Sequence, residues 1–563
     1  MKNKQFTVQQ EAAINSHAPF VMCIAGPGSG KTSVLVERIR RRLSSGSLPA
    51  NVAVITYTNA AAREITSRLS GVSLGYCGTL HGFAMLVLRN YGSIIGYGGR
   101  VGVIDEDAAA EMLLAKAHQL GSKTPVKDLE ELKRQVITSP AKRPTVDQTV
   151  VQAYLAELRE SALVDLDTIL PECLRVLRTS AKIQIPFTDV LWDEVQDAAA
   201  IDWQIFNELP CSRKFAVGDP DQAIYGFRGG DVRIMLDLMN HAEAAKIKLV
   251  YLDKNFRCGP AICHAANRLI AHNVERPLKQ TESAVDHDDA VVFLGASRHE
   301  REEAQSIADV IEERLHGHSV AVIARSHAIV AVVRKELEAR GVPVDQPQKT
   351  GLPADWPYVR SILELVVNPD NDALAYFHLL QNNLRIGLSL EEARSAAHKV
   401  RVQAAKIGQS INQQGWNFQR AAIDDIPSIL ERHGASLESR TLVAKLINEI
   451  PGAKTLENLA VAAAGLQRAP AEETTGNVVA CITAHAAKGR EWDHVFIAGC
   501  EKEVWPGRGD AEEERRLMFV AITRARKSVR LSYSSTRESA WGKHEPEKRN
   551  PSQFIAEAMG GVA

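Results

Sequence analysis

AGPGSGKT, residues 25–32, decides the fold class of this chain of 563 residues. The stretch follows the apolar run FVMCI at 20–24 and opens the helical pattern KTSVLVERIRRRL at 31–43. Glycines let the backbone curl so that its N–H groups converge on phosphate oxygens, and the start of the helix adds its positive end. In this strand-to-helix context the pattern predicts a nucleotide phosphate site. The residues expected to line it are Ala25 (in place of the usual first glycine), Gly26, Pro27, Gly28, Ser29, Gly30, Lys31 and Thr32.

Short apolar runs of strand length recur around this site and predict parallel sheets covered on both faces. Helical patterns follow several of them, which favours an α/β fold. The first set of runs is FVMCIAG at 20–26, VAVITYT at 52–58, DVLWDE at 189–194, KFAVGD at 214–219 and KLVYLD at 248–253. The second set is AVVFLGA at 290–296, SVAVIAR at 319–325, NVVACITAH at 477–485, DHVFIAG at 493–499 and SVRLSYS at 528–534.

Two α/β domains, each interrupted by a helix-rich insertion, are therefore expected. The stretches between the runs are rich in Ala, Leu, Glu and Arg and hold few β-branched residues. The predicted division is 1–85 with 187–256 for the first domain, 86–186 for its insertion, 257–354 with 476–563 for the second domain, and 355–475 for its insertion.

The composition fits a soluble globular protein and does not by itself indicate a nucleic-acid partner. The net charge is −1, so DNA binding would need a local basic channel on a neutral body. The eight cysteines form no C-x-x-C pair and no zinc-like pattern, which favours reduced thiols. The N-terminus lacks an apolar signal core and no apolar run reaches the roughly 20 residues that a bilayer requires, so a cytoplasmic location is expected.

A second acidic motif supplies what hydrolysis of a nucleoside triphosphate needs. Asp193 and Glu194 end the predicted strand at 189–194. Asp193 is suited to the Mg²⁺ shell, together with Thr32, and Glu194 to orienting and deprotonating the attacking water. Lys31 would neutralise the β- and γ-phosphates. Paired acids also cap helices, but their combination with Lys31 and Thr32 favours the catalytic interpretation.

Further motifs resemble superfamily 1 DNA helicases of the UvrD/Rep/PcrA type, in a short form, and they occur in that family's order. The similar segments are FTVQQEAAI (6–14), TYTNAAAREI (56–65), GTLHGFAMLVLR (78–89), DEVQD (193–197), VGDPDQAIYGFRGGD (217–231), NFRC (255–258), ITAHAAKGREWDHVFIAG (482–499) and EEERRLMFVAITRARKSVRLS (512–532). The resemblance implies two RecA-like motor domains, with ATP and Mg²⁺ as cofactors.

The resemblance also assigns roles around the nucleotide. Gln10 would bond the adenine edge, Gln222 would sense the γ-phosphate and Glu491 would meet the ribose. Arg257 and Arg524 would act as arginine fingers from the second domain, so that hydrolysis depends on domain closure.

Two positions depart from the family pattern at the adenine. Phe256 replaces the usual stacking Tyr and keeps the ring. Ser33 replaces an Arg that commonly covers the other face of the base, which weakens the base sandwich.

For DNA, the resemblance points to aromatic rings that stack on bases and to polar side chains that hold the strand. Core packing is the alternative for each ring. The expected DNA-binding residues are Tyr57, Thr58, Asn59, His81, Phe83, Tyr225, Phe227, Arg228 and His485.

The expected function is an ATP-dependent 3′-to-5′ single-stranded DNA translocase and helicase that acts on single strands and duplex junctions. One alternative is a DNA-stimulated NTPase motor or sensor subunit, with a protein partner, in a larger repair, recombination or anti-phage defence complex. An inactive DNA-binding scaffold would require losses at the catalytic positions, and none occurs. An RNA-specific helicase stays open, although the motifs match the DNA branch better.

Overall fold

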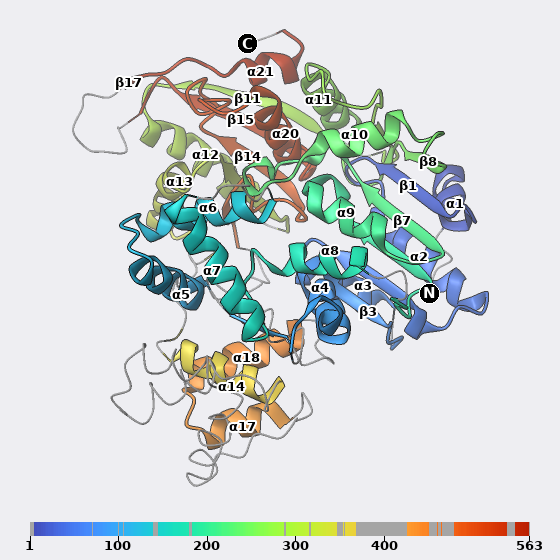
Figure 1. Cartoon of the computed structure of the whole chain (residues 1–563). Coiled ribbons are helices and arrows are strands. Elements are labelled where there is room, and N and C mark those ends of the chain that lie inside the picture. Colours follow the sequence, from blue (N-terminus) through green and yellow to red (C-terminus); the bar gives the residue numbers. More distant parts are fainter. Residues whose placement is uncertain are drawn as a thin grey trace.

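The computed structural model of the chain contains two large parallel sheets, each flanked by helices (Figure 1). It describes residues 5–69, 71–98, 101–104, 106–138, 145–179, 183–286, 289–314, 317–345, 353, 355–367, 425–449, 459, 463, 478–537 and 547–561. Within these residues, no helix has both the length and the apolar character needed to cross a membrane.

The first sheet has six parallel strands in the order β3-β2-β6-β7-β1-β8. They are β1 (Phe20–Ala25), β2 (Val52–Thr56), β3 (Tyr76–Thr79), β6 (Asp189–Asp193), β7 (Arg213–Gly218) and β8 (Ile247–Leu252). The five strands expected from the apolar runs are confirmed. The sixth, β3, was not predicted, because YCGT is only four residues long and contains glycine, which is depleted in strands.

Alternating side chains of the central strands enter two separate cores, one on each face of the first sheet. In β1, Val21 and Cys23 face one core, whereas Met22 and Ile24 face the other. The first face is covered by α1 (Val8–Asn15), α2 (Lys31–Ser44) and α3 (Asn59–Arg68). The second is covered by α4 (Leu80–Tyr91), α8 (Ile169–Thr179), α9 (Ala200–Glu208) and α10 (Val232–Asn240). Burial on both faces explains why these strands read as almost continuous apolar runs.

The second sheet has five parallel strands in the order β11-β15-β14-β12-β13. All five were expected, and they are β11 (Ala290–Ser297), β12 (Val320–Ala324), β13 (Ala480–Thr483), β14 (Trp492–Ala498) and β15 (Ala525–Ser534). One face packs on α11 (Pro260–Ile270), α20 (Ala511–Ile522) and α21 (Gln553–Met559). The other packs on α12 (Glu300–Arg314) and α13 (His327–Ala339). Short strand pairs are β9 (Lys254–Asn255) with β10 (Glu282–Ser283), and β16 (Thr536–Arg537) with β17 (Glu547–Lys548).

The first insertion forms its own small core. Its helices are α5 (Glu106–Gln119), α6 (Val126–Thr138) and α7 (Val146–Glu160), and a short pair β4 (Gly102–Val103) and β5 (Leu163–Val164) joins them to the first domain. The predicted boundary after residue 85 falls inside α4, and α4 packs in the core of the first sheet through Val87 and Leu88. The first domain therefore extends through α4, and it also includes α8.

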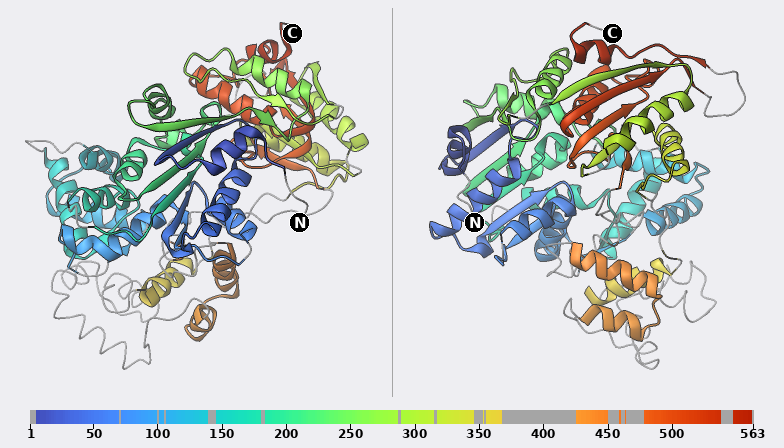
Figure 2. Two further views of the ribbon diagram at one scale, coloured as in Figure 1. Left: turned by 90° about the vertical axis from the view of Figure 1, so that its right-hand side faces the viewer. Right: turned by 180° about the vertical axis from the view of Figure 1, so that it is seen from behind.

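Of the second insertion, only part can be compared with the prediction, because most of 355–475 lies outside the described residues. The described part is helical, as expected, and contains α14 (Trp356–Val367), α17 (Ile426–Arg432) and α18 (Leu437–Glu449). In Figures 1 and 2 the two sheets lie side by side, the helices of the first insertion lie beside them, and α14, α17 and α18 gather at one end of the molecule.

Candidate nucleotide and DNA site

The phosphate loop joins β1 to α2 and is shaped by its glycines. Gly28 and Gly30 have φ of +64° and +82°, in the left-handed region that favours glycine. The Ser29 hydroxyl donates to the Gly26 carbonyl at 2.7 Å, which closes the loop. Lys31 and Thr32 follow as the first residues of α2, so the loop N–H groups and the helix N-terminus converge on one point. The local geometry is that of an anion cradle.

Gln10 is fixed against this loop. It lies in α1, where it forms a capping box with Thr7, and its side chain is buried. Its Nε2 donates to the Ser29 carbonyl at 2.9 Å. The structure thus places Gln10 at the loop, where the expected role in reading adenine stays a prediction.

The acidic pair lies directly across from the loop, at the carboxyl end of β6. Glu194 has φ of +57°, which a residue other than glycine adopts only at a cost in energy. Its Oε2 accepts from Lys31 Nζ at 3.1 Å and from Gln196 Nε2 at 2.6 Å. Such strained backbone held by side-chain contacts is typical of functional sites.

The two carboxyl groups of the pair differ in their environments. Burial opposes ionisation of Glu194, yet the positive charges of Lys31 and then Lys488 hold its pKa below the usual range. Burial, and then the negative charge of Glu194, raise the pKa of Asp193. Among the described residues, the Asp193 carboxyl group accepts one hydrogen bond, from the Glu194 N–H to Oδ1 at 3.0 Å, so it keeps acceptor capacity for a ligand.

The segment that leads into the second domain, residues 255–257, closes over the phosphate loop. The Phe256 N–H donates to the Gly28 carbonyl at 2.9 Å. A Cβ at Gly28 would lie 2.4 Å from Asn255 Oδ1, so only glycine allows this approach. Arg257 Nη1 donates to the Thr523 carbonyl at 3.2 Å, and its Nε pairs with Glu491 Oε2 at 2.5 Å. The expected finger residue and the expected ribose residue are therefore partners of each other.

Gln222 joins the two domains directly. Its Nε2 donates to Asp219 Oδ2 at 2.5 Å, and its Oε1 accepts from Arg524 Nη2 at 3.2 Å. Arg524 is almost fully buried, at 2% exposure. Burial, followed by the charge of Arg257, lowers the pKa of Arg524 to about 9, which reflects a guanidinium that lacks a full counter-charge. An anionic phosphoryl group would supply that charge.

An aromatic row runs from the end of β2 across the loop that follows Gln222. The Tyr57 and Tyr225 rings stack at 5.0 Å, with 19° between their planes. Phe227 is 66% exposed, and its ring meets His485 of the second domain edge-on at 5.4 Å. The Arg228 guanidinium lies 5.4 Å from the Tyr225 ring centre and 5.6 Å from that of Phe227. The exposed Phe227 ring, with half-buried aromatic rings and a cation beside it, is the kind of surface that binds single-stranded nucleic acid.

His485 completes this row as a neutral ring at physiological pH. Burial, and then the charges of Arg325, Arg228 and Lys488, lower its pKa to about 4. Thr58 is exposed and caps α3, and Asn59 begins that helix. His81 lies half-buried in the first turn of α4. The DNA roles of these residues stay predictions.

The comparisons with known proteins cover nearly the whole chain. The UvrD/REP helicase N-terminal domain matches residues 6–243, and the UvrD-like helicase C-terminal domain matches 250–412 and 436–536. The chain belongs to the UvrD/Rep helicase family. It is also 25% identical to the ATP-dependent DNA helicase PcrA of Staphylococcus aureus (strain MRSA252), over 99% of this chain and 86% of that protein. The PcrA protein of Staphylococcus epidermidis (strain ATCC 35984) is likewise 25% identical, over 98% and 86%.

As a UvrD/Rep-type helicase, the chain is an ATP-driven enzyme with two motor domains. One residue at the junction of these domains was missed by sequence reasoning. Lys488 pairs with Asp197, donates to the Gln222 carbonyl at 2.9 Å and lies 5.0 Å from the Tyr225 ring centre. It therefore touches the acidic motif, the Gln222 loop and the aromatic row together. Its position inside a motif shared with UvrD/Rep helicases, 482–499, was the available signal.

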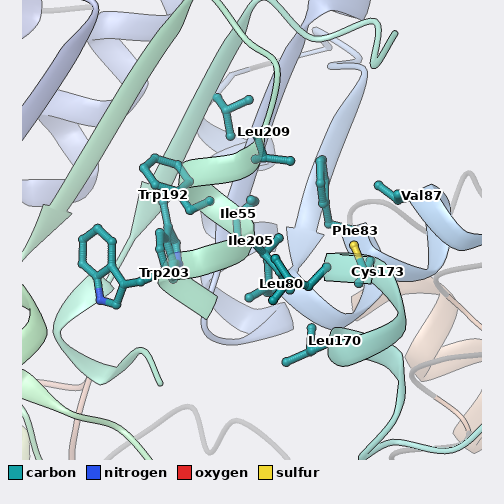
Figure 3. Packing of buried hydrophobic residues seen from close by; sticks show 14 of the residues in the cluster. Ile55, Leu80, Phe83, Val87, Leu170, Cys173, Trp192, Trp203, Ile205 and Leu209 are labelled. Atoms are coloured by element: carbon teal, nitrogen blue, oxygen red, sulfur yellow. The ribbon is translucent and has the colours of Figure 1, made fainter. Parts of the chain in front are cut away.

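Phe83 is the correction to the expected DNA-binding set. Its side chain is fully buried and packs edge-on against Tyr76 at 5.4 Å. Figure 3 shows it in the core with Val87 and Cys173. Thr79 caps α4, and Phe83, in the first turn of that helix, packs in the core of the first sheet. A base cannot reach the ring, so Phe83 supports the fold of this UvrD/Rep helicase.

We expect Phe227→Ala and Phe83→Ala to affect different properties of this helicase. Phe227→Ala should weaken single-stranded DNA binding by about 1–3 kcal/mol, since one stacking ring is lost. Its free energy of unfolding should change little, because the ring is exposed. Phe83→Ala should lower the free energy of unfolding by about 3–5 kcal/mol. Fluorescence anisotropy with a labelled oligonucleotide and urea denaturation measure the two quantities. Equal DNA affinity in Phe227→Ala and the wild type would show that Phe227 does not bind DNA.

Proposed function

We propose that the chain is a Mg²⁺- and ATP-dependent motor that translocates 3′-to-5′ on single-stranded DNA and separates duplexes at junctions. The observation that carries the proposal is the path from the nucleotide to the aromatic row. Gln222 contacts Arg524, and the loop that follows Gln222 holds Tyr225 and Phe227 beside His485. A change at the phosphoryl group can therefore reach the DNA surface through one short loop.

Both domains contribute residues at each end of this path, at the nucleotide and at the DNA surface. At the nucleotide, Arg257 and Arg524 come from the second domain and the phosphate loop from the first. At the DNA surface, Tyr57 and Tyr225 come from the first domain and His485 from the second. Closure of the two domains around a triphosphate would therefore narrow the aromatic row, and opening after hydrolysis would widen it. Such alternation is a means of moving along a strand.

The donor set fits a divalent cation next to the triphosphate. Asp193 is buried, keeps acceptor capacity and lies next to the loop that ends in Thr32. Carboxylate and hydroxyl oxygens are ligands that Mg²⁺ prefers. Bound there, Mg²⁺ would neutralise charge on the phosphate oxygens. Glu194 would orient the attacking water and accept its proton, because its charge is kept by Lys31.

Polarity is tested by protein displacement from single-stranded DNA. Oligonucleotides carrying streptavidin on a 5′-biotin or a 3′-biotin are incubated with the enzyme and ATP. A 3′-to-5′ motor clears streptavidin from the 5′ end faster than the spontaneous rate and leaves the 3′ end at that rate. Faster clearance of the 3′ end would overturn the proposed polarity.

Unwinding is tested separately with duplexes that carry a 3′ or a 5′ single-stranded tail. The proposal predicts ATP-dependent unwinding of the 3′-tailed duplex. Streptavidin displacement without any unwinding would instead favour the second function, a motor subunit that needs a partner in a larger complex.

A further inference from the structure

At the base-binding end of the nucleotide site, Ser33 stands where UvrD/Rep helicases commonly have an arginine that covers one face of the base. This inference rests on the proposed use of ATP. Ser33 is the third residue of α2, and its side chain cannot cover the face of a purine. Phe256, the residue expected to stack on the base, is 46% exposed, and its N–H donates to the Gly28 carbonyl at 2.9 Å, so it also lies at the phosphate loop.

A guanidinium from another helix lies at the Ser33 wall. Arg68 is the last residue of α3, and its Nη1 donates to Ser33 Oγ at 3.2 Å. Its Nη2 pairs with Glu64 Oε1, one turn earlier in α3, at 2.5 Å. The Arg68 carbonyl accepts from Arg40 of α2, which ties the end of α3 to α2. Contacts on both the side chain and the backbone therefore hold this arginine beside Ser33.

The same wall adjoins the residue expected to read adenine. A Cβ built on Gly30 would lie 3.2 Å from Gln10 Nε2 and 3.9 Å from Ser33 Cβ. Gln10, Gly30 and Ser33 thus form one continuous surface next to the phosphate loop, and Arg68 lies at the edge of that surface. The Arg68 side chain is 44% exposed, so part of it is accessible to a ligand.

We propose that Arg68 supplies the cation that stacks on the nucleotide base opposite Phe256, in place of the arginine absent at position 33. A planar guanidinium stacks on an aromatic face and attracts its electrons. Glu64 orients the group and balances part of its charge, which favours binding of the neutral base over binding of a phosphate. The cation that covers the base therefore comes from α3 instead of α2.

The test compares two ligands, one with a base and one without. Equilibrium dissociation constants for ATP and for inorganic tripolyphosphate are measured by calorimetry with Mg²⁺ and without DNA. Arg68→Ala should weaken ATP binding on the order of tenfold, the scale of one lost stacking cation. Tripolyphosphate binding should stay at the wild-type value, since it uses only the phosphate loop. Arg134→Ala, an exposed arginine in α6, is the matched control and should leave both constants unchanged.

Rescue separates stacking from a general disturbance of α3. Ser33→Arg in the Arg68→Ala background should restore ATP affinity to within about threefold of the wild type, because the guanidinium returns from the original side. Unchanged ATP binding in Arg68→Ala, parallel weakening of tripolyphosphate binding, or failure of the rescue would each overturn the inference. The assay needs neither turnover nor DNA, so its result is independent of whether DNA stimulates hydrolysis.

Discussion

Glu194→Gln should reduce ATP turnover on the order of a thousandfold while ATP still binds. The carboxylate is the group that orients and deprotonates water, and proton transfer by a positioned side chain contributes up to about 10⁴-fold. The amide of Gln can still accept from Lys31 and Gln196, which bond Glu194 at 3.1 and 2.6 Å. The geometry of the site is therefore kept, and only the base is removed.

Binding of ATP by this variant should match the wild type within about threefold, because the phosphate loop, Lys31 and Gln10 are intact. Steady-state release of inorganic phosphate measures turnover, and calorimetry measures the dissociation constant for ATP. Glu208→Gln, at the exposed end of α9, is the matched carboxylate control and should turn over ATP normally. Retained turnover in Glu194→Gln would show that another group activates the water.

Arg524→Ala should reduce turnover by about 10³-fold or more, the usual effect of losing an arginine finger. Its guanidinium donates to Gln222 Oε1 at 3.2 Å and to the Val520 carbonyl at 3.0 Å, so its removal breaks the contact between the second domain and the Gln222 side chain. Single-stranded DNA binding without nucleotide should persist, because the aromatic row does not include this side chain.

Removal of a buried group also affects folding, so Arg524→Lys serves as the second variant. It keeps a charge but not the planar fork, and it should recover only part of the rate. Lys527→Ala, three residues after Arg524 and within β15, is the control for loss of a nearby cation. A folded Arg524→Ala protein with wild-type turnover would contradict the assignment of the finger.

The strands were predictable because burial on both faces requires apolar residues at nearly every position, and such runs are visible in the sequence. β1 and β12 are apolar throughout and β2 is apolar up to its last residue, Thr56; their side chains are buried, except that Phe20 is half-buried. β3 has no such apolar run, since it is short and lies at the edge of the sheet. The end of the first domain was misplaced because a helix pattern does not tell which core the helix joins, and α4 joins the core of the first sheet.

The site was less predictable, because a motif gives a residue's place along the chain and not the direction of its side chain. Phe83 and Phe227 both occupy family motifs, yet one is fully buried and the other 66% exposed. Contacts between distant segments were also hidden. Arg68 and Ser33 are 35 residues apart, and Lys488 and Asp197 are 291 apart. Only the folded chain brings these pairs together.

The central claim, that ATP hydrolysis is coupled to DNA, is tested most directly by ATP turnover of the purified chain with and without single-stranded DNA. Because the path from Gln222 to the aromatic row couples the two sites, saturating DNA should raise ATP turnover by about tenfold or more. This is the size of effect that coupling between two binding sites typically has. The same stimulation should disappear in Glu194→Gln. Turnover that is abolished in Glu194→Gln but indifferent to DNA in the wild type would contradict the coupling and leave a nucleotide hydrolase without a DNA motor.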